Sequence, residues 1–163
     1  MHVHSVILGS MTTVAPSTRG KLARPAIFGS FDGTASLLAV VVYLLVTHPA
    51  LIFPTALAGA IGSAISMGGG EWLSDSENGL GASGVMAVAT FTGALLPALP
   101  FAFGRGPAAI AESVIICCLT GVTVACMRHG RALWRALAET FGIMLTVLAA
   151  ILALGLVLPG GAA

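Results

Sequence analysis

Residues 63–77 read SAISMGGGEWLSDSE. This stretch closes a long apolar segment with the thioether of Met67, three consecutive glycines, and then the carboxylates of Glu71, Asp75 and Glu77. The whole chain has six acidic residues, so this stretch contains half of them. Carboxylates gathered at the end of an apolar segment make it the first candidate for a functional site.

The composition is that of a membrane protein. Of the 163 residues 57% are hydrophobic and only 8% are charged, and the mean hydropathy is +1.02. A soluble domain carries roughly a quarter charged residues. The net charge of +1 gives no reason to expect a nucleic-acid partner, and the length suits one compact domain.

The apolar segments predict five transmembrane helices. A bilayer helix needs about 20 mostly apolar residues, and five such windows cover residues 26–47, 51–73, 83–103, 107–127 and 137–158. These windows are too long and unbroken for barrel strands, so we expect an all-α membrane protein. The five helices form a single transmembrane domain over residues 25–160, after an interfacial or disordered arm at residues 1–24.

The basic residues predict the orientation in the membrane, because loops rich in Lys and Arg stay in the cytoplasm. One group precedes the first helix and another lies between the fourth and fifth, so with five spans both fall on one side; they are Arg19, Lys21, Arg24, Arg128, Arg131 and Arg135. Only Arg105 falls on the other side. We therefore expect the N-terminus in the cytoplasm and the C-terminus outside.

Asp32 is the first candidate residue for binding a cation. It lies about seven residues, or roughly 10 Å, into the first expected helix, and an ionisable group at such a depth is costly unless it faces a cavity or a partner. The alternative is that the helix starts later and the Asp32 carboxylate caps its backbone N–H groups. Gly29 and Gly33 form a small-residue pair that allows another helix to approach closely.

The second helix adds further ligands at a depth expected to match that of Asp32. Met67, Glu71 and Asp75 are spaced four residues apart, which keeps them near one helix face. Carboxylates are hard ligands, and a thioether favours later, more polarisable metals over Ca²⁺ or Mg²⁺. Because a carboxylate binds metal only when deprotonated, the same groups could carry protons in the opposite direction. Met67 could instead fill the core, and we regard Glu77 as a weaker candidate at a solvated helix end.

Three other features leave alternatives open. Glu112 could be an exit ligand or an interfacial carboxylate near Arg105. Pro97 and Pro100 could form a gate or simply end the third helix. Glu139 is expected to pair with Arg135, four residues before it.

The cysteines and the last connector have structural interpretations. Cys117, Cys118 and Cys126 are expected to be small buried hydrophobes without disulfides. The basic connector over residues 128–135 is typical of an anchor at the lipid headgroups. No phosphate-binding loop and no nucleophile with a base and an orienting acid occurs in the sequence, so we expect neither an enzyme nor a cofactor.

Three short segments together resemble the vacuolar iron transporter family: GSFDG at 29–33, ISMGGGEWLS at 65–74 with Ser76 and Glu77 after it, and LLPALPF at 95–101. The resemblance extends over about residues 26–158. It implies that Asp32 and Met67 line a pathway for Fe²⁺ or Mn²⁺ between two protomers, and that these ions leave the cytoplasm in exchange for protons.

The chain departs from the family pattern between the second and third helices. Family members have a Glu-rich cytoplasmic helical insert there, whereas only about residues 78–83 fill this place. Asp75 and Glu77 could then form a minimal entrance for the metal. We expect a homodimeric Fe²⁺ or Mn²⁺ transporter of the bacterial plasma membrane; the alternative is a non-transporting membrane subunit or scaffold that keeps the same fold.

Overall fold

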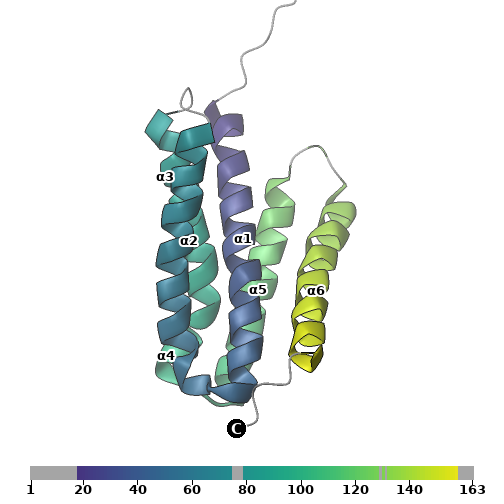
Figure 1. Cartoon of the computed structure of the whole chain (residues 1–163). Helices are drawn as coiled ribbons and strands as arrows, with labels where there is room; N and C mark the ends of the chain where they lie inside the picture. Colours follow the sequence, from purple (N-terminus) through teal and green to yellow (C-terminus); the bar gives the residue numbers. More distant parts are fainter. Residues whose placement is uncertain (1–17, 75–78, 129, 131, 158–163) are drawn as a thin grey trace, which may run out of the picture.

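The structure is a computed structural model that describes residues 18–74, 79–128, 130 and 132–157, and these residues form a helical bundle without strands (Figure 1). Its elements are α1 (Thr18–Thr47), the short 3-10 helix η1 (Pro49–Leu51), α2 (Ile52–Ser74), α3 (Gly79–Ala98), α4 (Pro100–Phe103), α5 (Pro107–Met127) and α6 (Leu133–Val157). Residues 1–17 of the expected arm, Asp75 and Glu77 lie outside the described residues.

The expected count of five membrane helices is confirmed. Among the described residues, five helices are long and apolar enough to cross a bilayer: α1, α2, α3, α5 and α6. The first helix begins at Thr18, eight residues before the expected start at 26. Its first turns, TRGKLAR, are polar enough to extend beyond the bilayer, and Pro25 is accommodated inside the helix.

The bundle has one basic end. Figure 1 shows the start of α1, the end of α2, the start of α3, the end of α5 and the start of α6 at the same end of the molecule. Arg24, Arg128 and Arg135 lie in or beside these segments, and we call this the basic end. The two groups of arginines lie at one end, as expected for a chain with five spans. The side of the membrane that this end faces stays a prediction.

α3 is the helix on which α1 and α2 both pack. Glycines permit the close contact with α1: a Cβ added at Gly29 would lie 2.7 Å from the Met86 carbonyl oxygen, and one at Gly33 would lie 2.8 Å from the Ala94 nitrogen. A Cβ at Gly93 of α3 would meet the backbone of Ser30 in turn. The expected close approach at Gly29 and Gly33 is therefore present, and the approaching helix is α3.

The prolines break the third span near its end. Pro97 has no N–H to donate to the Gly93 carbonyl four residues earlier. The Thr34 hydroxyl of α1 lies 3.0 Å from that carbonyl oxygen and 2.8 Å from the Ser30 carbonyl oxygen, so its single proton is shared between them. The chain then turns at Leu99 into α4, as the prolines predicted.

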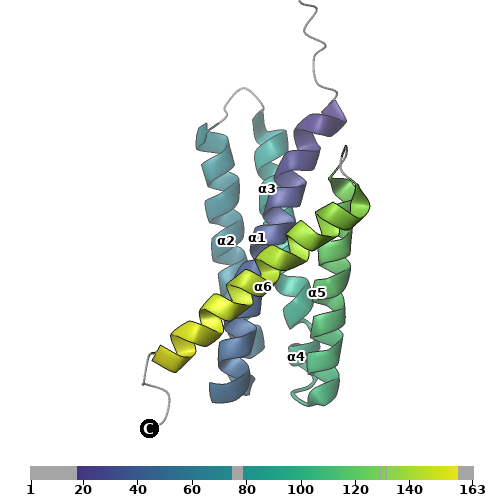
Figure 2. The ribbon, with the colours of Figure 1, turned by 90° about the vertical axis from the view of Figure 1, so that its right-hand side faces the viewer.

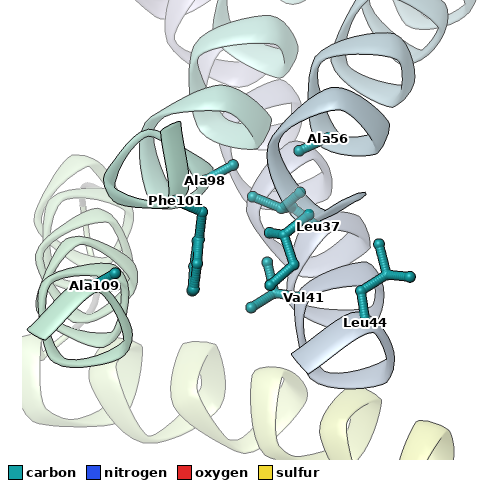
Figure 3. Close-up of a cluster of buried hydrophobic side chains, with 8 residues drawn as sticks. Leu37, Val41, Leu44, Ala56, Ala98, Phe101 and Ala109 are labelled. Atoms are coloured by element: carbon teal, nitrogen blue, oxygen red, sulfur yellow. The ribbon is translucent and has the colours of Figure 1, made fainter. Parts of the chain in front are cut away.

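A hydrophobic cluster closes the end of the bundle opposite the basic end. Figure 3 shows the ring of Phe101 lying between the side chains of α1 and Ala109 of α5. The cluster comprises Leu37, Val41, Leu44, Ile52, Ala56, Ala98, Phe101 and Ala109. Because α1 and α2 are joined here through η1, this is also where they pack against each other; Figure 2 shows them separating toward the basic end.

α6 crosses the faces of α1 and α5 diagonally (Figure 2). Glu139 of α6 accepts a hydrogen bond from the Arg128 guanidinium at 2.6 Å, so the ion pair ties the end of α5 to α6. The sequence predicted Arg135 as the partner of Glu139, whereas this ion pair is formed with Arg128, the residue that follows α5.

The cysteines are free, as expected, but only Cys117 is buried. Cys118 and Cys126 are exposed on the outside of α5. The expectation of three buried thiols was wrong for these two, since α5 buries only one narrow face, which includes Ala109, Ser113, Cys117 and Gly121.

Candidate metal site

Asp32 lies inside an unbroken helix. The candidate span of α1 runs from Leu22 to Thr47, so Asp32 is ten residues, or about 15 Å, from its start. The alternative in which the carboxylate caps a later helix start is therefore wrong. Continuous helix on both sides leaves Asp32 near the middle of the span.

The Asp32 side chain is half-buried and lies beside the contact with α3, not within it. At about 100° per residue, Asp32 lies roughly 60° from Gly29 and 100° from Gly33 around the helix. Its neighbours on this side, Phe28 and Ser36, are exposed. Within the part of the chain that the structure describes, the carboxylate has neither a hydrogen bond nor an ion pair.

Met67 and Glu71 are both half-buried on α2. Between them, Gly68 packs directly on α3: a Cβ there would lie 2.8 Å from the Ala87 side chain and 3.1 Å from the Ser83 carbonyl oxygen. One turn separates Met67 from Glu71, so the two side chains lie on the same side of the helix. α2 ends at Ser74, whose hydroxyl donates to the Glu71 carbonyl at 3.2 Å.

The contacts with α3 fix the relative depth of Asp32 and Met67. The turn of Gly33 meets Thr90 and Ala94, whereas Gly68 meets Ser83 and Ala87. These contact pairs are centred about seven residues apart along α3. Asp32 lies one residue nearer the basic end than Gly33, and Met67 lies one residue farther from it than Gly68, so the offset between Asp32 and Met67 is about five residues, or roughly 7–8 Å. Met67 is thus nearer the basic end than Asp32, and the two residues form successive levels instead of a facing pair.

Glu112 is exposed on α5, one residue before the buried Ser113. It lies in the second turn of that helix, near the end opposite the basic end. Its position separates it from Met67 and Glu71. Among the described residues, no three His, Cys, Asp or Glu side chains converge on a common point, so the arrangement offers one or two strong ligands at each level.

Two polar features of α3 carried no clear sequence signal. Ser83 has the one fully buried side-chain oxygen without a hydrogen bond in the described segments. The Gly93 carbonyl depends on Thr34 because of Pro97. The proline could have drawn attention to the unpaired carbonyl four residues earlier, but only the packing shows which helix supplies the donor.

The fold defines an integral membrane protein with a carboxylate in the middle of a span. Residues 23–79 match the family model described as VIT family, which agrees with the resemblance of the sequence to the vacuolar iron transporter family. The matched segment includes Asp32, Met67 and Glu71, and the family's proteins are membrane metal-ion transporters, not enzymes. Neither the curated proteins nor the solved structures include a match to the chain.

Proposed function

We propose that the chain is a homodimeric transporter that moves Fe²⁺ or Mn²⁺ out of the cytoplasm in exchange for protons. The observation that carries this proposal is the unpaired Asp32 carboxylate in the middle of α1. An ionisable side chain at this depth is expensive and is a functional candidate by default. The family match, which covers Asp32, supports metal-ion transport as the function.

The proposed path has two levels. Glu71 and Met67 receive the ion near the basic end, and Asp32 receives it roughly 7–8 Å deeper than Met67. The mixed oxygen and sulfur ligands favour Fe²⁺ or Mn²⁺ over Ca²⁺. Few ligands at each level suit transport, because the ion must bind and also leave. Asp32 exchanges a proton for the metal, since it must be deprotonated to bind a cation.

A second copy of the chain would cover the open side of α1 and α2. Beyond Gly68, four glycines of α2 have open space where a Cβ would be added: Gly59, Gly62, Gly69 and Gly70. Small residues in a membrane helix allow another helix to pack closely. A pairing that also included the Asp32 side of α1 would withdraw the Asp32 carboxylates from lipid, which supports a pathway between two protomers.

The test uses the purified chain in liposomes that enclose a metal-sensitive dye and a pH dye. We expect Mn²⁺ or Fe²⁺ uptake together with movement of protons in the opposite direction, and a dimer after crosslinking in membranes. The short connection at residues 75–78 favours the alternative of a scaffold that does not transport. Absence of metal flux with stable co-purification of a larger complex would decide for that alternative.

A further inference from the structure

The Ser83 hydroxyl differs from the hydroxyl groups of the three buried threonines. Those of Thr34, Thr90 and Thr140 each donate to the carbonyl four residues earlier, at 2.7–2.9 Å. Ser83 is only 8% exposed, and its oxygen has no partner among the described residues. A buried polar group without a partner is uncommon, and one explanation is a ligand or water that binds it.

Ser83 lies where α2 meets α3. Its carbonyl oxygen would be 3.1 Å from a Cβ at Gly68, so the two backbones are in close contact. Met67 precedes Gly68, and Glu71 is one turn nearer the basic end. α2 and α3 run in opposite directions (Figure 1), and Ser83 is likewise one turn nearer that end than Ala87, the other contact of Gly68. Ser83 and Glu71 are therefore at about the same level.

We propose that the Ser83 hydroxyl is a further oxygen ligand at the level of Glu71 and Met67, and that it binds the divalent cation directly or through one of its waters. The inference rests on the proposed transport function and adds α3 to the helices that hold the ion. A neutral hydroxyl adds a donor oxygen without adding charge. The site then holds the cation with one carboxylate, one thioether and one hydroxyl from two helices.

Replacing the oxygen by sulfur tests this role more specifically than removing it. Equilibrium dialysis of the detergent-solubilised full chain would measure the affinities for Mn²⁺ and Cd²⁺. Cd²⁺ is a soft ion that prefers thiolate, so Ser83→Cys should raise the ratio of Cd²⁺ to Mn²⁺ affinity about tenfold. The matched control is Ser113→Cys, which places a thiol at a similarly buried serine of α5. Both variants are made with the three native cysteines replaced by alanine, because Cys117 lies one turn from Ser113. The control should leave the ratio within about twofold.

Ser83→Ala removes only the hydroxyl and should weaken Mn²⁺ binding about tenfold, with an unchanged helical circular dichroism spectrum. Equal Cd²⁺ to Mn²⁺ ratios in the two cysteine variants, or unchanged Mn²⁺ binding in Ser83→Ala, would overturn this inference and leave the proposed function in place. If the parent chain binds neither ion, the proposed function fails, and the role of Ser83 fails with it.

Discussion

At the scale of single residues, Asp32 does not fit a purely structural role. It lies in the middle of the membrane helix α1, and its carboxylate has no hydrogen bond or ion pair among the described residues. Glu139, in contrast, sits near the basic end and is paired with Arg128. The difference leaves Asp32 as a carboxylate available to an ion, as the proposed pathway requires.

Asp32→Asn should reduce metal flux at least about tenfold, because the amide keeps the size of the side chain but loses the charge and the exchangeable proton. Flux into liposomes measured with a metal-sensitive dye checks this, with Glu112→Gln as the matched loss of an exposed carboxylate. Equal flux in Asp32→Asn and the parent would remove Asp32 from the pathway.

The Thr34 hydroxyl should stabilise the fold because Pro97 leaves the Gly93 carbonyl without a helical donor. Thr34→Val should lower the free energy of unfolding by about 1–3 kcal/mol. In a Pro97→Ala background the backbone N–H of residue 97 can donate to the Gly93 carbonyl. The loss of unfolding free energy caused by Thr34→Val should then be smaller. Chemical unfolding of all four proteins gives the coupling between the two sites; equal costs in both backgrounds would show that the hydroxyl and the proline are independent.

At the scale of helices, the contact between α1 and α3 is one of backbone against backbone. Gly29 and Gly33 on one helix and Gly93 on the other leave no room for a side chain. Backbone atoms cannot rotate away as a flexible side chain can, so this pair of helices is expected to move as one unit. α2 has a similarly close contact with α3 at Gly68, while its other glycines face open space.

Gly33→Ala should destabilise the chain by about 1–3 kcal/mol, because the new methyl group meets the Thr90 and Ala94 backbone. Gly142→Ala in α6 meets nothing within 4 Å and should be neutral or stabilising by up to about 1 kcal/mol through helix propensity. Thermal unfolding in detergent compares the two variants. Similar unfolding temperatures would mean that α1 and α3 are less closely packed than described.

At the scale of the whole molecule, the bundle is closed by apolar side chains at one end and separates at the other. The cluster around Phe101 packs α1, α2, α4 and α5 together, whereas α1 and α2 diverge toward the basic end (Figure 2). The residues of the proposed entry level lie toward the end at which α1 and α2 diverge; they are Met67, Glu71 and Ser83. This arrangement suits entry of an ion from the basic end.

Labelling of single cysteines in intact cells should show which side that end faces. An impermeant maleimide should label Gly104→Cys from outside, since Gly104 is exposed between α4 and α5. It should label Ala132→Cys, exposed between α5 and α6, only after permeabilisation. Both variants would be made in a chain whose three native cysteines are replaced by alanine. The reverse pattern would contradict the orientation derived from the arginines.

The sequence by itself determined the class of fold, because the length and apolarity of a segment decide whether it can span a bilayer as a helix. It also selected Asp32, Met67 and Glu71, because charge and sulfur are conspicuous in an apolar chain. Only the tertiary structure decided their relative depth, the role of α3 between α1 and α2, and the isolation of the Ser83 hydroxyl. These depend on which helix faces fit together, and that choice rests on contacts between Gly29, Gly33, Gly68 and Gly93 and residues far away in the sequence.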